Sequence, residues 1–174
     1  EEEHEEHEEE GHEDEHGDED IHAGELPVFL FQTDDVALYG FEAQGIWQVN
    51  ANFKATFQAD YVRAELDEGG NLPRIPPMRF GTRLDYVNDR VSANLNWTHF
   101  ADQDDVATLE TETDGYDWVN ASINYRIPLK ATDLTVFVKA ENLLDEEARV
   151  HSSFLKDIAP RPGRNFRIGI RGTF

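Results

Sequence analysis

The chain has 174 residues and is strongly acidic, with Asp+Glu 37, Lys+Arg 15 and a formal net charge of -22. Such a chain repels phosphate, which argues against a nucleic-acid partner. It contains no cysteine, so disulfides, thiolate metal sites and cysteine nucleophiles are excluded. We find no run of about 18 apolar residues and expect no transmembrane helix. The sequence begins at Glu1 without a recognisable signal peptide. We therefore expect a processed or truncated piece of a longer protein.

The acidic charge is concentrated at the beginning of the chain. Residues 1–20 carry 14 acidic side chains and no Lys or Arg, which leaves a net charge of -8 (-22 plus 14) for the remainder. A segment of this composition cannot bury a core, and we expect it to be disordered when no ion is bound. We therefore divide the chain into a His- and acid-rich segment, 1–25, and a strand-rich region, 26–174.

Five of the seven histidines fall in the acidic segment: His4, His7, His12, His16 and His22. Imidazole nitrogen combined with carboxylate oxygen suits Zn²⁺, and also Ni²⁺, Cu²⁺ or Co²⁺. Without thiolates we expect several weak, exchangeable sites that depend on pH, because histidine must be deprotonated to bind a metal. The alternative is an acidic, solvated loop in which the histidines are incidental.

Seven later segments alternate apolar and polar residues, which is the signature of β-strands. In the last segment, for example, Phe166, Ile168 and Ile170 lie on one face, whereas Arg167 and Arg171 lie on the other. Phe137 is an exception to the alternation in its own segment. The predicted strands are 36–49, 51–66, 78–88, 90–102, 116–128, 132–143 and 164–174.

Alternation of this kind fits a soluble β-sandwich as well as a membrane barrel. The predicted strands are longer than the five or six residues usual in soluble sheets and long enough to cross a bilayer at a tilt. The connections also alternate between tight turns and the long polar segments 67–77, 103–115 and 144–163, which is the pattern of outer-membrane barrels. We therefore favour an all-β, transmembrane antiparallel barrel with its apolar face in lipid and its polar face in a wet lumen.

Several short motifs resemble the C-terminal part of TonB-dependent outer-membrane receptors. They are YGFEA at 39–43, LPRIPP at 72–77, NLLD at 142–145, HSSFLKD at 151–157, AP at 159–160, PGRNF at 162–166 and the terminal Phe174. The resemblance covers about 26–174. It implies a 22-stranded barrel in the Gram-negative outer membrane, of which this chain supplies about seven strands. It also implies an N-terminal plug and a TonB-contact segment, both absent from this chain, and import of scarce metals or metal chelates.

The family's orientation places the final strand end in the periplasm, so the three long connections are expected outside the cell. Residues 26–35 are then expected to extend the first strand upward, with 1–25 at the tip of an extracellular loop. If 26–33 were instead a separate membrane crossing, the acidic segment would lie in the periplasm.

Other residues carry weaker predictions. His99 and His151 are candidate metal ligands, His99 on the lumen side only if a bulge intervenes in its strand. The lumen arginines Arg79, Arg83, Arg126, Arg167 and Arg171 are expected to form salt bridges with Asp60, Asp85 and Glu141. Gly163 is expected to allow a positive φ where the last long connection enters the final strand.

The sequence thus predicts an outer-membrane, TonB-dependent importer of a transition metal, most of all zinc, because it resembles the zinc-uptake (ZnuD-like) receptors. Its expected partners are outer-membrane lipid, TonB and the transported ion, and no catalytic cofactor is expected. A receptor for a siderophore or other chelate and a passive, non-transporting barrel remain open alternatives. An enzyme is not expected, because the sequence has no nucleophile elbow, Ser-His pairing or phosphate loop.

Overall fold

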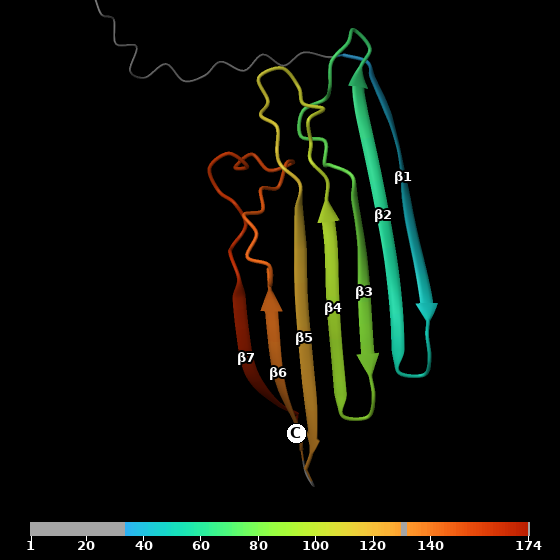
Figure 1. Cartoon of the computed structure of the whole chain (residues 1–174), viewed down its shortest axis with the longest axis vertical. Helices are drawn as coiled ribbons and strands as arrows, with labels where there is room; N and C mark the ends of the chain where they lie inside the picture. The colour runs from blue at the N-terminus through green and yellow to red at the C-terminus, as the bar shows by residue number, and fades with distance from the viewer. Residues whose placement is uncertain (1–33, 130–131, 174) are drawn as a thin grey trace, which may run out of the picture. The chain divides into compact units, whose positions relative to one another are not determined.

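The structure, a computed structural model, describes residues 34–129 and 132–173. These residues form one antiparallel sheet of seven strands, ordered in space as they are in sequence (Figure 1). The strands are β1 (Val36–Gln48), β2 (Phe53–Leu66), β3 (Arg79–Val87), β4 (Val91–Phe100), β5 (Tyr116–Pro128), β6 (Asp133–Glu141) and β7 (Asn165–Thr173). All seven predicted strands are confirmed. No helix in the described part is long and apolar enough to cross a membrane.

The connections alternate between the two ends of the sheet, as predicted. Tight turns join β1 to β2 and β3 to β4 at one end, where β5 and β6 also follow each other closely in sequence, and three long connections lie at the other end (Figure 1). In the first turn the Asn50 side-chain oxygen accepts the backbone N–H groups of Asn52 and Phe53, and Asn88 acts in the same way in the second turn. Asparagine favours such turns because its side chain replaces a backbone acceptor. We call the long connections loop A (67–78), loop B (101–115) and loop C (142–164).

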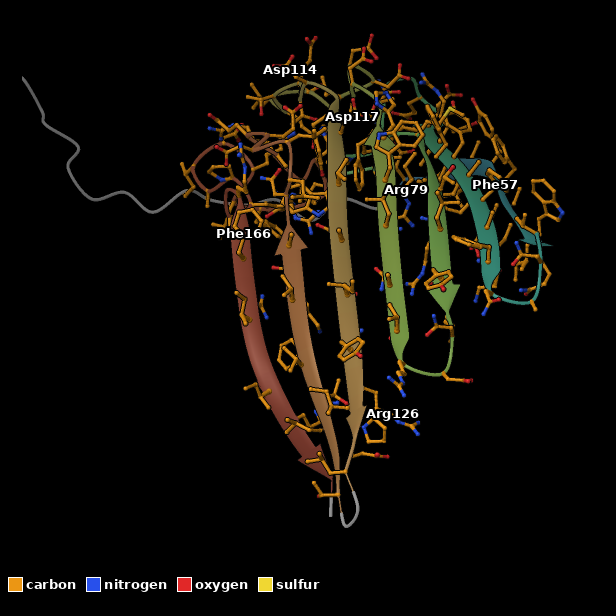
Figure 2. All side chains as sticks on the ribbon, turned by 60° about the horizontal axis from the view of Figure 1, so that its bottom comes forward. Phe57, Arg79, Asp114, Asp117, Arg126 and Phe166 are labelled. Atoms are coloured by element: carbon orange, nitrogen blue, oxygen red, sulfur yellow. The ribbon has the colours of Figure 1, made fainter. Side chains whose placement is uncertain are left out.

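Within residues 34–129 and 132–173, no second protein layer covers the apolar face of the sheet. Large apolar side chains remain open along the whole face, with Ile168 on β7 77 % exposed and Leu84 on β3 48 % exposed. A β-sandwich would bury this face against a second sheet, so the structure excludes that alternative among the described residues. Phe57 of β2 and Phe166 of β7 lie on strands far apart in the sheet (Figure 2), and the strand registers place both on this apolar face. An uncovered apolar face on long strands is the arrangement of a membrane barrel.

The strand pairing on the polar face explains why Phe137 breaks the alternation of apolar and polar residues. Its partner on β7 is Gly169, and the Phe137 ring lies where a Gly169 side chain would project. A Cβ atom added to Gly169 would approach the ring's Cζ atom to 2.3 Å. Phe137 therefore occupies the polar face because glycine leaves room for its ring across the strand pair.

A small buried core lies at the loop end of the polar face. Tyr116 and Trp118 of β5 are buried with Ala148 of loop C, and Phe100 of β4 packs against them. The Arg161 guanidinium of loop C lies 4.0 Å from the centre of a Trp118 ring, close enough for a cation–π contact. Loop C therefore folds back over this end of the sheet.

The NLLD motif at 142–145 holds the base of loop C. The Asn142 side chain is fully buried, and its amide donates to the carbonyl oxygens of Glu146 and Pro162, thereby joining the two ends of the loop. The expectation for Gly163 was wrong, because its φ is not positive. The Asp145 carboxylate lies next to Gly163 instead, 3.2 Å from where a Cβ would stand, and accepts the following backbone N–H.

Gly169→Ala is expected to destabilise the full-length protein, because the added methyl group collides with the Phe137 ring. Overpacking of this kind costs about 1–3 kcal/mol. The free energy of unfolding in guanidinium measures the change. Gly172→Ala on the same strand is the matched control, because nothing lies within 4 Å of its added Cβ. Equal stability of the two variants would contradict the packing described for Phe137.

Candidate functional site

The three long loops meet at Glu110 of loop B. Its Oε1 atom accepts the backbone N–H of Arg74 in loop A at 3.0 Å and lies 3.2 Å from the Nζ of Lys156 in loop C. Its Oε2 atom accepts the N–H of Ala107 within loop B at 3.1 Å. The Glu110 side chain is only 9 % exposed. One nearly buried carboxylate therefore contacts all three loops.

Burial alone would raise the pKa of Glu110, because it penalises the charged carboxylate. The N–H groups of Ala107 and Arg74 and the Lys156 ammonium outweigh that effect, and the pKa of Glu110 lies below its ordinary value. Glu110 is therefore ionised at neutral pH and forms a charge-assisted contact with Lys156. Such contacts are stronger than those between neutral groups.

His151 of loop C is buried beside this carboxylate, with its side chain 1 % exposed. Its Nδ1 lies 2.9 Å from the Thr113 hydroxyl and 3.4 Å from the Lys156 ammonium. An ammonium can only donate, so Nδ1 accepts and Nε2 carries the proton. Nε2 faces Glu110 Oε1 at 3.3 Å without a well-formed hydrogen bond. Burial, and then the Lys156 charge, lower the pKa of His151 and keep the ring neutral.

Further contacts connect the same loops. The Thr111 hydroxyl of loop B donates to Asp157 of loop C at 2.6 Å, and the Arg74 guanidinium lies 3.5 Å from the centre of the Phe154 ring. Asp105 of loop B forms an ion pair with Arg63 near the end of β2. We call Glu110, His151 and Lys156, with these supporting contacts, the loop clasp.

The chemistry of the loop clasp suits a structural role better than a metal site. Glu110 and His151 would supply two ligands, but the Lys156 ammonium lies against the same carboxylate oxygen and opposes a cation. Within residues 34–129 and 132–173 no three His, Asp or Glu side chains are grouped to hold a metal ion. The assignment of His151 as a metal ligand stays a prediction.

His99 lies on the apolar face near the loop end of β4. The β3–β4 and β4–β5 registers continue past it without a bulge, so the condition for a lumen position is not met. Its Nδ1 lies 2.9 Å from Asp117 of β5, whose same oxygen accepts the Trp97 indole N–H at 2.9 Å. Figure 2 shows Asp117 near the loop end of β5. His99 thus belongs to a polar pair at the rim of the apolar face, and its role as a metal ligand is untested.

The remaining candidate ligands, His4, His7, His12, His16 and His22, lie outside the described residues. So do residues 26–33, on which the placement of segment 1–25 depends. Those assignments stay predictions.

The predicted ion pairs of the polar face form in part. Three pairs have N–O distances of 2.6 to 2.9 Å: Arg79–Asp60, Arg83–Asp85 and Arg167–Glu141. Arg126 lies 3.7 Å from Asp133, an acid that was not among the predicted partners. Arg171 has no carboxylate partner among the described residues.

The sequence did not reveal Glu110 and Lys156 as a pair. Glu110 looks like one acid among many in loop B, and Lys156 lies 46 residues further along the chain. No spacing signal connects two loop residues so far apart. The motif at residues 151–157 includes Lys156 but gives no indication of its partner.

Two comparisons place this geometry among known proteins. The sequence matches the family described as TonB dependent receptor-like, beta-barrel, over residues 16–143. A solved structure titled "Copper transporter OprC" matches with a TM-score of 0.69 and 22 % sequence identity, covering 79 % of this chain and 23 % of that one. The chain thus spans about a quarter of the length of that protein. At this identity the likeness supports the fold alone.

Lys156→Met is expected to loosen the contact between loops B and C, because it leaves the Glu110 charge nearly buried without its partner. Breaking a buried pair in this way costs about 3–5 kcal/mol. Because the chain has no cysteine, spin labels attached at the exposed positions Leu109→Cys and Ile158→Cys report the distance between these loops. The distribution of distances between the two spin labels should be broader in the Lys156→Met variant than in the wild type. Lys54→Met is the control, since Lys54 is 45 % exposed and its pair is weak; equal broadening there would contradict the loop clasp.

Acidification is expected to open the loop clasp in two stages. The pKa of His151 is lowered from 6.5, so the open state binds the proton more readily and closure weakens as pH falls below about 6.5. The pKa of Glu110 is lowered from 4.5, so its contribution is present above that pH and is lost as pH falls further. The same spin-label distances, recorded from pH 8 to pH 3, measure both stages. His151→Gln should lack the first stage and keep the second.

Proposed function

The chain belongs to the TonB-dependent receptor-like β-barrel family, and from that premise we propose that it is part of a receptor that imports a transition metal, most of all zinc. The chain lies in the outer membrane of a Gram-negative cell, with its apolar face in lipid. In the proposed receptor, energy for import is delivered by TonB through a segment outside this chain.

The observation that carries the metal assignment is the composition of residues 1–25. Five histidines stand there among carboxylates, with no Lys or Arg in residues 1–20 to compete for those carboxylates. Neutral imidazole and carboxylate groups are ligands of Zn²⁺, and a high negative charge raises the local concentration of cations. Capture by this segment, followed by transfer to the lumen, is the proposed sequence of events.

Zinc is favoured over copper by the ligand types available. Soft sulfur ligands select Cu(I), and this chain has no cysteine and a single methionine. The name of the matching solved structure describes that protein and not this one. A Cu²⁺ cargo would still find imidazole ligands, so the experiment includes copper as a competitor.

The family and the matching transporter structure favour import over catalysis. The polar face carries ion pairs and amide groups, and the buried titratable groups of the loop clasp, Glu110 and His151, contact each other and Lys156. No cofactor is part of the proposal. A receptor for a metal chelate is the second candidate, favoured if zinc binding proves to be independent of the histidines.

Replacing the five histidines of segment 1–25 by alanine in the full-length receptor is expected to abolish high-occupancy zinc binding at pH 7.5. It should also lower zinc uptake by cells at low external zinc. The reason is that carboxylates alone hold zinc weakly in water. Calorimetry with Zn²⁺, in competition with Cu²⁺, and ⁶⁵Zn accumulation by cells are the measurements. The replaced positions are His4, His7, His12, His16 and His22.

The matched control keeps the histidines and changes five glutamates of the same segment to glutamine. It should retain most of the zinc sites, and both this control and the wild-type receptor should lose zinc binding as the pH falls below about 6.5, where histidine is protonated. Unchanged zinc binding and uptake in the histidine variant would overturn the assignment of zinc to this segment.

A further inference from the structure

The apolar face of β4 and β5 ends in a polar cluster at the loop end of the sheet. The strand pairs that lie below the cluster on this face are apolar: Ala93–Ile123, Leu95–Ala121 and Trp97–Val119. The next pair toward the loops is His99–Asp117. A charged side chain on the lipid face of a barrel is costly near the middle of the bilayer and costs much less at its interfaces. Asp117 is therefore expected at the level of the lipid headgroups.

The length of the apolar column agrees with that level. Tyr125, near the other end of the same face of β5, lies eight residues from Asp117, which corresponds to about 27 Å of extended strand. At a tilt of about 40° this length crosses most of an apolar band that is about 25 Å tall. The column thus has an aromatic residue at one boundary of the bilayer and the carboxylate at the other.

This part of the outer surface does not depend on strands outside the described residues. β4 and β5 are interior strands, and β3 and β6 flank them on both sides. Closing the barrel encloses the polar face and leaves the apolar face in lipid. The polar cluster is continuous with that lipid-facing surface, so its neighbours in the full-length receptor are lipid molecules.

The carboxylate of Asp117 is held in a fixed orientation and keeps one oxygen available. Its Oδ1 atom accepts the Trp97 indole N–H and the His99 Nδ1–H, both at 2.9 Å, because a carboxylate can only accept. Among residues 34–129 and 132–173, no donor contacts its Oδ2 atom and no Lys or Arg pairs with it. The Asp117 side chain is 39 % exposed. An oriented, negatively charged acceptor therefore lies open at the headgroup level.

An aromatic surface adjoins this carboxylate. Phe80 of β3 is opposite His99, and its ring centre lies 5.0 Å from that of His99 and 5.4 Å from that of Trp97. Phe80 remains 41 % exposed, so part of its ring is open to the surroundings. The negative face of an aromatic ring attracts cations, ammonium groups among them. We call Phe80, Trp97, His99 and Asp117 the rim cluster.

We propose that the rim cluster binds the ammonium group of a lipid headgroup, which donates a hydrogen bond to Asp117 and lies against the exposed part of the Phe80 ring. The acyl chains of the same lipid then lie along the apolar column below. A contact between an ammonium donor and a carboxylate is charge-assisted and stronger than one between neutral groups. A headgroup phosphate finds no Lys or Arg within the rim cluster. The proposal rests on the placement of the apolar face in lipid and is independent of the zinc assignment.

Binding of phosphatidylethanolamine to the full-length receptor in detergent tests the proposal. Phosphatidylglycerol with the same acyl chains is the comparison lipid, because its headgroup carries hydroxyls and no ammonium. Phosphatidylethanolamine should bind about tenfold more tightly, since it alone forms the charge-assisted contact. Native mass spectrometry counts the lipid molecules bound to each receptor as the lipid concentration is raised.

Two variants locate the site on the protein. Asp117→Asn removes the charge with little change of shape and should abolish the preference for phosphatidylethanolamine. Phe80→Leu keeps the surface apolar and should lower the affinity for that lipid about two- to fivefold, because the cation–π contact is lost. Asp89→Asn is the matched control, since Asp89 is exposed in the turn between β3 and β4 at the other end of the sheet. Circular dichroism checks that each variant keeps its strands.

The outcomes are distinct. A preference for phosphatidylethanolamine that is lost in Asp117→Asn and kept in Asp89→Asn supports the headgroup site. Equal binding of the two lipids by the wild type, or a preference for phosphatidylglycerol, overturns it. A preference that persists in Asp117→Asn, or that is lost equally in the control, also overturns it. Zinc uptake by cells is a separate readout, so failure here leaves the proposed function unaffected.

Discussion

The structure depends on the environment of one uncovered apolar face. Each interior strand forms hydrogen bonds to both neighbours, so backbone groups within the sheet are satisfied, but no second layer of the described residues shields the apolar side chains. In water that exposure would be unfavourable at about 25 cal/mol per Å², whereas lipid removes the penalty. In the same lipid, backbone N–H and C=O groups left without hydrogen bonds at the outer edges of β1 and β7 would be energetically costly. The sheet is therefore stable as part of a closed barrel, with strand partners outside the described residues.

The loop clasp extends that rigidity beyond the strands. Loops on a barrel rim are expected to move independently, because they lack continuous hydrogen-bond ladders. Here Glu110 contacts all three loops, and the adjoining Tyr116–Trp118–Ala148 core fixes loop C against β5. Burying charge is favourable only when the charge is well paired, so the clasp is stable in one arrangement and sensitive to protonation. The loop end of this sheet therefore has a defined surface.

Strands and faces were predictable from the sequence because a period of two residues is a local signal, and the predicted strands agree with the observed ones. The side chains that depend on distant partners were not. Phe137 breaks the pattern because of Gly169, 32 residues later, and Glu110 meets Lys156 across two loops. The cations of the polar face were identified, but Arg126 lies near Asp133 and not near a predicted acid. Local alternation determines the face of a residue, whereas its contact on that face depends on the register and on loop folding.

Opposite charges are separated along the barrel wall. Loop B is rich in acids, whereas the polar face of β5–β7 has an excess of cations, and Figure 2 shows Asp114 and Arg126 toward opposite ends of this region. Twelve residues of extended chain correspond to about 40 Å, several times the Debye length of about 8 Å at physiological ionic strength. The two regions are therefore screened from each other, and the net charge of -22 describes neither. A charged group at either end of this region therefore interacts mainly with the charges within its own screening distance.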